Sequence, residues 1–372
     1  MKIALFDVTV TVSFGGVQTA VWELARALHD AGHQVCVFGG EGSIRPDLGG
    51  RTIAVQTFPF TPREKVLDLG SRFRRLWERW SFASHALPAL FEGDFDWVVL
   101  TKPFDFFLPW RMPASSRTRF CFMSGGTDFF RGDRKLGRKV DAWVACSHFN
   151  AWQIAHHYKR FPAVIFNGVD TTVFSAQARE AGLRESLGFA DTDVVFAFAG
   201  RLVGWKGVSV AIRALAAPEL QGLPVKLLLI GGGEARQSLG DLAAKLGVAE
   251  CVKFVPPVPH RELPKYYAAA DAGIFPSIGD EAFGITIAEA MASGLPVVAS
   301  HIGGIPEVVG NEGRSGLLAP AGDVAGFARA MANLAKDAGG RQRMGEAAAQ
   351  RIRENFTWTL SAQRLLHALT AA

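Results

Sequence analysis

Short apolar runs that end in glycine alternate with helical stretches along most of this chain, and the whole rhythm occurs twice. The first half opens with KIALFDVTV, passes Gly15-Gly16 and continues into a predicted helix over residues 17–31, which Gly32 ends. Further strands are predicted at residues 97–100, 119–123, 142–145 and 163–166. The second half restarts with VVFAFAG, which ends at Gly200. Alternating strands and helices are typical of βαβ units, so we predict an α/β fold with parallel sheets.

The chain is long enough for two domains. Its 372 residues exceed one ordinary core and suffice for two domains of roughly 150–200 residues each. We predict a Rossmann-like domain over residues 1–170, a second one over 171–355, and a final helix over 356–372 that can cross back to the first domain. Two doubly wound sheets would face a central cleft, where ligands gather outside the carboxyl ends of the strands.

Composition excludes several classes of protein. Residues 1–170 carry 21 Lys and Arg against 16 Asp and Glu, a net charge of +5 that is too small for a dedicated nucleic-acid binder. No apolar run approaches the roughly 20 residues that span a bilayer, and the N-terminus is interpreted as a first strand, so we expect a cytoplasmic protein. The four cysteines form no C-x-x-C pair and are expected to be buried free thiols.

The segment PSIGDEAFGITIAEAMASGLPVVAS, residues 276–300, carries the strongest chemical signal. Gly284 lies between Glu281 and Glu289, at the point where a loop is predicted to turn into a helix over about residues 285–293. A helix N-terminus presents free N–H groups and a partial positive charge, which suits a diphosphate. Glu281 can accept hydrogen bonds from sugar hydroxyls, and Glu289 can accept two from a ribose.

A second signal is GRLVGWKG, residues 200–207, a glycine-rich loop that follows a strand. Arg201 and Lys206 lie five residues apart in it. A planar guanidinium and a compact ammonium together suit a diphosphate leaving group, whose developing charge they would neutralise. The spacing therefore predicts an anion site at this loop.

Together with NGVD at residues 167–170, Gly15-Gly16 and GGIPE at residues 303–307, these motifs resemble the family-4 retaining glycosyltransferases of the GT-B fold. The resemblance is dense in residues 165–325 and diffuse in 40–120. It implies transfer of a sugar from a nucleotide sugar, with Arg201 and Lys206 on the donor diphosphate, and Glu281 on the sugar. Phosphate contacts would come from the backbone of Phe283, Gly284 and Ile285, ribose contacts from Glu289, and further donor contacts from Gly16 and Gly200.

One stretch departs from the family pattern. Many relatives carry a histidine after a strand of the first domain, often as H-G-T-D, whereas this chain has SGGTD at residues 124–128, which places Gly125 at the histidine position. Ser124 and Asp128 are the candidates to replace it on the acceptor side. For Asp128 a catalytic role and a simple helix cap both stay open, and for Gly15-Gly16 a purely structural turn stays open.

Other functions are weighed against these motifs. A non-catalytic nucleotide-sugar binder is the main alternative, and a hydrolysing or epimerising enzyme on the same fold would need an additional acid–base set. The first loop lacks G-x-G-x-x-G, which argues against a dinucleotide oxidoreductase. Asp191 and Asp193 imitate a D-x-D metal site but precede a strand, so we interpret them as turn residues. We predict no metal requirement, and the acceptor is a glycan, a lipid-linked sugar or a small molecule.

The segment REKVLDLGSRFRRLWERWSF, residues 63–82, combines basic and aromatic residues. At helical spacing, Phe73, Leu76, Trp77 and Trp80 share one face and Arg72, Arg75 and Arg79 another. Two interpretations remain open: a helix that lies on an anionic membrane surface, or an ordinary helix that covers the sheet of the first domain. Gly70 and Ser71 predict a late start and a short helix.

Overall fold

The computed structural model describes residues 1–13, 15–126, 128–176, 180 and 182–372. The chain forms two compact units, one from Met1–Gly168 with Trp358–Ala372, the other from Val169–Thr357. The last helix therefore belongs to the N-terminal unit although it ends the sequence. In the described part of the chain, no helix combines the length and apolar character that a membrane span requires.

The N-terminal unit is built on a seven-stranded parallel sheet in the order β3-β2-β1-β4-β5-β6-β7. Its strands are β1 (Lys2–Phe6), β2 (Gln34–Gly40), β3 (Ala54–Phe58), β4 (Trp97–Leu100), β5 (Arg119–Ser124), β6 (Ala142–Ala145) and β7 (Ala163–Val164). Its helices are α1 (Gly16–Asp30), α2 (Ser71–Glu92), α3 (Leu108–Arg111), α4 (Asp133–Leu136), α5 (His148–Tyr158) and α14 (Trp358–Ala371). Most residues of these strands are apolar, as expected for a parallel sheet with helices on both faces, whereas the edge strand β3 is only partly buried.

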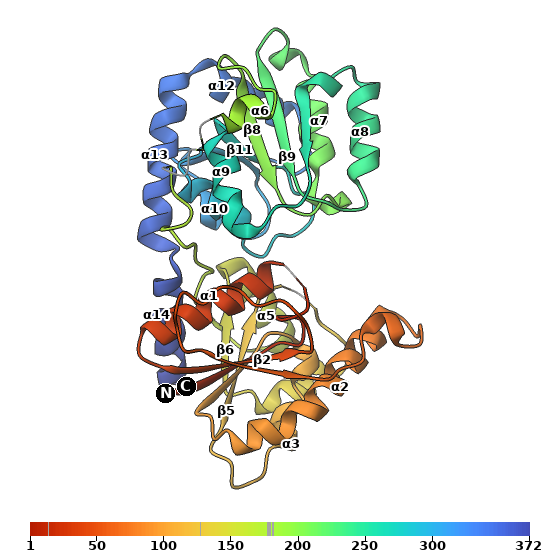
Figure 1. Ribbon diagram of the computed structural model, residues 1–372, viewed down its shortest axis with the longest axis vertical. Helices are drawn as coiled ribbons and strands as arrows, with labels where there is room; N and C mark the ends of the chain where they lie inside the picture. Colours follow the sequence, from red (N-terminus) through yellow and green to blue (C-terminus); the bar gives the residue numbers. More distant parts are fainter. Residues whose placement is uncertain (14, 127, 177–179, 181) are drawn as a thin grey trace. The chain divides into compact units, whose positions relative to one another are not determined.

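One face of this sheet packs against α1 and α14, which lie side by side in Figure 1. Leu24 and Leu28 of α1 and Leu365 and Leu369 of α14 are fully or almost fully buried in the same apolar cluster. The other face packs against α2 and the turns after β4, through a second cluster rich in phenylalanine. Because α14 completes the cover of the first face, the C-terminal segment is part of the core of this unit.

The C-terminal unit contains a six-stranded parallel sheet in the order β10-β9-β8-β11-β12-β13. Its strands are β8 (Val194–Ala199), β9 (Val225–Ile230), β10 (Val252–Val255), β11 (Ala272–Phe275), β12 (Val297–Ser300) and β13 (Gly316–Ala319). Its helices are α6 (Leu183–Ser186), α7 (Val208–Leu215), α8 (Arg236–Lys245), α9 (Leu263–Ala268), α10 (Ile285–Ala292), α11 (Ile305–Val309), α12 (Val324–Lys336) and α13 (Ala338–Asn355). The strand order reverses beside β8, so this unit is doubly wound.

Helix α2 begins at Ser71 as predicted, but the prediction of a short helix was wrong. It runs for 22 residues with Pro88 inside it. Phe82 and Leu90 are fully buried against the sheet, whereas Trp77 and Trp80 remain 43% and 42% exposed. The helix therefore covers the sheet, as one of the two interpretations of residues 63–82 required.

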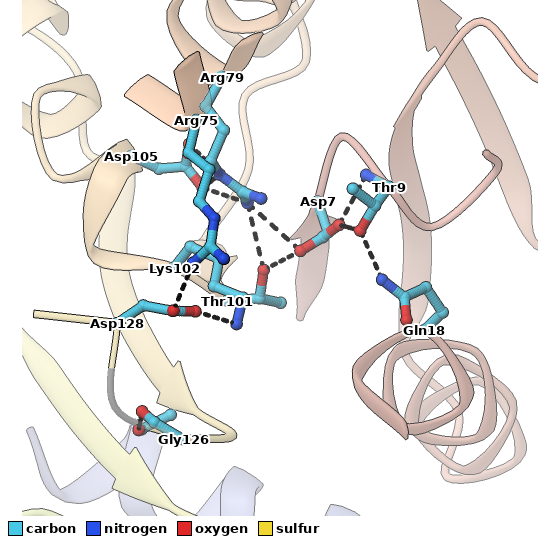
Figure 2. Close-up of polar contacts among 11 residues, drawn as sticks. Asp7, Thr9, Gln18, Arg75, Arg79, Thr101, Lys102, Asp105, Gly126 and Asp128 are labelled. Atoms are coloured by element: carbon cyan, nitrogen blue, oxygen red, sulfur yellow. Dashed lines mark hydrogen bonds and ion pairs between the residues drawn. The ribbon is translucent and has the colours of Figure 1, made fainter. Parts of the chain in front are cut away.

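Arg79 of α2 is buried in a cluster of charged groups, so it does not belong to a solvent-facing basic side of this helix. Its guanidinium donates to both carboxylate oxygens of Asp105, at 2.6–3.0 Å, and to Asp7 Oδ2 at 3.3 Å (Figure 2). Thr101 joins Arg79 to Asp7, because its hydroxyl contacts both. Burial raises the pKa of Asp105 to about 6 although Arg79 opposes that shift, whereas for Asp7 burial is outweighed by Arg79 and Thr101, and its pKa is lowered.

The buried cluster of Arg79, Asp7 and Asp105 predicts that loss of the Arg79 charge strongly destabilises the N-terminal unit. Arg79→Met keeps most of the side-chain volume but leaves two buried carboxylates without a cation, so we expect the free energy of unfolding of the N-terminal unit to fall by about 3–5 kcal/mol. Thermal and urea unfolding would measure it. Arg72→Met, at an exposed position of the same helix, is the matched control and should change stability by less than about 0.5 kcal/mol. Equal stability of the two variants would contradict the role of the cluster.

Candidate functional site

The two motifs of the C-terminal unit meet in the structure. The loop of residues 200–207 follows β8 and the segment of residues 276–284 follows β11, and these strands are neighbours in the sheet. The N–H groups of Ile278 and Gly279 donate to the carbonyl oxygen of Trp205, at 2.9 and 3.1 Å. Gly207 has φ 65°, and a Cβ atom there would lie 1.9 Å from the carbonyl oxygen of Pro276. The sequence GWKG therefore allows one loop to lie directly on the other.

Lys206 and Glu281 form an ion pair across this contact, between Nζ and Oε2. Both side chains are mostly buried, and the ammonium also lies 4.5 Å from the centre of the Trp205 ring. A lysine ammonium has three donors, so this pair leaves two for a ligand. Arg201 is exposed, and its side chain makes no hydrogen bond or ion pair with a described residue.

The loop that carries Glu281 is fixed from its other side by the segment after β12. Gly304 N–H donates to the carbonyl oxygen of Glu281 at 2.8 Å. Gly303 has φ 60°, and a Cβ atom there would lie 2.3 Å from that same oxygen. The GGIPE motif is thus a support for this loop. Gly200, at the end of β8, is approached equally closely: a Cβ atom on Gly231 would lie 2.0 Å from its carbonyl oxygen.

Helix α10 begins where the sequence predicts. Gly284 precedes it in the left-handed conformation, with φ 94°, and Ile285 is its first residue. Phe283 is buried and packs edge to face on Phe356, with ring centres 5.7 Å apart. This apolar anchor fixes the position of the helix N-terminus, whose first N–H groups have no acceptor within the helix itself. The arrangement is suited to bind an anion.

Glu289 is one turn inside α10, and its carboxylate is buried. Oε1 lies 2.6 Å from Nε2 of His260, whereas Oε2 has no hydrogen-bond partner among the described residues. The side chain is only 3% exposed. A buried oxygen without a donor costs free energy, so this position suits a ligand that supplies a hydroxyl. His260 was not predicted as a site residue; its only signal in the sequence is its place in the loop after β10.

In the N-terminal unit, the predicted residues lie near the ends of two elements. Gly16 is the first residue of α1, and Ser124 is the last of β5. The Ser124 hydroxyl donates to the carbonyl oxygen of Gly126 at 3.0 Å. A Cβ atom on Gly125 would lie 3.4 Å from Val17 of α1, an ordinary contact distance, so a larger side chain has room to begin there. Thr127 lies outside the described residues.

Asp128 is held by two cations and does not cap a helix. Its carboxylate lies 2.6 Å from Lys102 Nζ and 2.9 Å from Arg75 (Figure 2). Burial would raise the pKa of Asp128, but Lys102 and Arg75 outweigh that effect and the pKa is lowered. The nearest following helix, α4, has Gly132 at its N-cap. Neither Lys102 nor Arg75 was predicted as a partner of Asp128, although Lys102 follows β4, a correctly predicted strand.

Asp193 belongs to a turn, as predicted from its position before a strand. Its carboxylate accepts from the Ala190 N–H at 2.9 Å, and its own N–H donates to the Ala190 carbonyl at 3.1 Å. Within the residues that the structure describes, no group of three or more His, Cys, Asp or Glu side chains is placed to hold a metal ion.

Comparison with known proteins covers both units. The family model described as "Glycosyltransferase Family 4" matches residues 14–173, and that described as "Glycosyl transferases group 1" matches residues 180–351. D-inositol 3-phosphate glycosyltransferase of Streptomyces scabiei is 35% identical over 253 residues, which are 65% of this chain and 56% of that protein. The enzyme of that name from Corynebacterium efficiens is 37% identical over 266 residues, 68% of this chain and 59% of that protein. The chain thus spans a little over half the length of these relatives.

Solved structures agree on the fold. Sucrose-phosphate synthase from Thermosynechococcus elongatus aligns over 100% of this chain and 98% of its own, with a TM-score of 0.82 and 21% identity. Anabaena HepE, in complex with UDP-glucose, aligns over 100% of both chains with a TM-score of 0.77 and 22% identity. The predicted GT-B fold is therefore confirmed. The chain belongs to the family-4 glycosyltransferases.

Proposed function

We propose that this chain is a retaining glycosyltransferase that moves a sugar from a nucleoside diphosphate sugar to a hydroxyl of a glycan, lipid-linked or small-molecule acceptor. The observation that carries the proposal is Glu289, a buried carboxylate with one oxygen that lacks a partner among the described residues. A ribose diol would supply that oxygen with a donor and bring the attached diphosphate toward the N-terminus of α10. The complexes of HepE with UDP and UDP-glucose support UDP as the first nucleotide to test.

In the proposed reaction, the bond between the anomeric carbon and the diphosphate oxygen breaks, and the acceptor oxygen bonds to the same face of that carbon. The acceptor proton passes to the departing phosphate oxygen, so the missing histidine is not required as a base. Arg201 and Lys206 stabilise the negative charge that develops on the diphosphate. Glu281, already paired with Lys206, receives the sugar hydroxyls and keeps the ammonium in place.

Asp128 is the proposed acceptor-side group in the N-terminal unit. Lys102 and Arg75 hold it as a carboxylate, so it can accept a hydrogen bond from an acceptor hydroxyl and orient it. The names of the relatives favour a phosphorylated polyol among the first acceptors to test.

We propose separately that residues 63–82 contact a membrane. The exposed side chains of Leu67, Leu69, Trp77 and Trp80 support this proposal, with Lys65 and Arg72 as basic neighbours.

The donor site predicts a specific dependence on the ribose. Wild-type protein should bind UDP more tightly than 2′-deoxy-UDP, by about tenfold or more, because a hydrogen bond to a buried carboxylate is lost. In Glu289→Gln the preference should largely disappear, while the fold persists because the substitution is nearly isosteric. Calorimetric titration of both nucleotides into both proteins gives the four dissociation constants that are compared. If Glu289→Gln preferred UDP over 2′-deoxy-UDP as strongly as the wild type does, Glu289 would not be the residue that binds the ribose.

The Lys206–Glu281 pair predicts non-additive effects on catalysis. Lys206→Ala should lower kcat by about 10² or more, the range for loss of one donor to a developing anion. Lys206→Arg should restore it only in part, because a planar fork does not replace a point charge. Glu281→Ala should lower kcat but keep UDP affinity, since Lys206 then loses an anionic competitor.

The double variant completes the test. In Lys206→Ala/Glu281→Ala, the loss of kcat, expressed as an activation free energy, should be smaller than the sum of the losses in the two single variants, because the pair acts as a unit. Full activity of Lys206→Ala would contradict the proposal that Lys206 stabilises the departing diphosphate. Specific UDP-sugar binding without any transfer or hydrolysis by the wild type, over a panel of donors and acceptors, would instead favour the non-catalytic alternative.

Two cationic side chains at the diphosphate make a divalent ion unnecessary for charge neutralisation in this proposal. Transfer activity should therefore persist in excess EDTA. EDTA preloaded with Mg²⁺ is the matched control for ionic strength. Complete loss of activity in free EDTA, with recovery on addition of Mg²⁺ or Mn²⁺, would show that the site uses a metal.

A further inference from the structure

A basic pocket lies on the N-terminal unit, and none of its residues belongs to the site described above. It has a volume of about 410 Å³ and is lined by Arg134, Lys135, Arg138 and Arg160 around the rings of Trp143 and Tyr158. The two rings are largely buried, whereas the four cationic residues are exposed. Four cations thus surround one aromatic floor.

The charges of these four side chains are not balanced by the protein. None of them forms an ion pair or side-chain hydrogen bond with a described residue. The acidic residue that directly precedes Arg134, Asp133, is turned inward: its carboxylate accepts from His157 at 2.9 Å, Tyr158 at 2.8 Å and the Phe130 N–H at 3.0 Å. Like charges around a low-dielectric floor repel one another, so an anion in the pocket would relieve an unfavourable interaction.

The segment that carries three of the cations, α4 and the residues directly after it, is held in place without a ligand. Gly137 lies on the Trp143 ring so closely that a Cβ atom would be 3.1 Å from it. On the other side, Trp110 Nε1 donates to the Leu136 carbonyl at 2.8 Å, and Lys139 lies 4.5 Å from the centre of the Trp110 ring. The backbone that carries Arg134, Lys135 and Arg138 is therefore fixed on both sides, which lowers the entropy cost of binding.

We propose that this pocket binds the phosphate group of a phosphate ester. Three arginines offer planar forks that match phosphate oxygens, and the lysine adds a point charge. The volume falls in the range of small-molecule sites, so the group attached to the phosphate is also accommodated. The ester is either a soluble phosphorylated compound or a lipid headgroup; Phe161, which follows Arg160 and is 92% exposed, would contact the lipid in the second case.

The first experiment uses glycerol 3-phosphate as the soluble probe, titrated by calorimetry at constant ionic strength. The pocket variant is Arg134→Ser/Arg138→Ser/Arg160→Ser. The control variant, Arg314→Ser/Arg343→Ser/Arg353→Ser, removes the same charge from exposed positions of the C-terminal unit. We expect saturable binding by wild type and control, weakened at least about tenfold in the pocket variant. Arg201→Ser should retain this binding, which separates the pocket from the proposed diphosphate site.

The second experiment measures co-sedimentation with vesicles of phosphatidylglycerol or of phosphatidylcholine, with the same proteins. Binding to phosphatidylglycerol alone, lost in the pocket variant and kept in the control, identifies a lipid headgroup as the source of the phosphate. Binding of glycerol 3-phosphate without vesicle binding identifies a soluble ester. Binding that is absent in both experiments, or weakened equally in pocket and control variants, overturns the proposal. Thermal unfolding of each variant confirms that the fold is intact.

Discussion

The proposed donor site depends on one close backbone contact, between the loop after β8 and the segment after β11. A side chain at Gly207 would overlap the Pro276 carbonyl, and two N–H groups of the segment donate to Trp205. Because this contact fixes both loops, Lys206 and Glu281 meet although they lie 75 residues apart. Gly303 lies against Glu281 in the same way, so the loop is supported on two sides by positions that only glycine fits.

Elements with a local sequence signal lie where they were predicted. Strands β4 and β6 lie where the apolar runs predict them, and α10 begins at Ile285 because Gly284 adopts the left-handed conformation. The loops of residues 200–207 and 276–284 lie together for a related reason, since parallel sheets bring the loops after their strands to one edge. Strand β3 was missed, because its residues, Ala54–Phe58, are only partly buried and lack a strong apolar pattern. His260 was missed because its partner, Glu289, is distant in sequence.

Helix α2 shows the limit of amphipathic patterns. Its arginines and aromatic residues do separate on the helix, but the pattern does not say which side faces the protein. The structure turns Arg79 into the interior, because Asp7 and Asp105 supply it with two carboxylates, and leaves Trp77 and Trp80 partly exposed. A sequence shows neither carboxylate as a partner, since they follow β1 and β4 and lie 72 and 26 residues from Arg79 along the chain.

The buried carboxylates of this chain thus have two different explanations. The carboxylates of Asp7 and Asp105 contact Arg79 and are satisfied by the protein itself, so their burial is explained by the attachment of α2 to the sheet. Glu289 has His260 on one oxygen, but in the part of the chain that the structure describes its other oxygen is the sole buried carboxylate oxygen without a partner. A fold that needed only stability would gain by replacing such a group with an apolar one. The unsatisfied oxygen is therefore better explained by a ligand than by packing, which is why the ribose assignment rests on Glu289 rather than on the more numerous charges of the N-terminal unit.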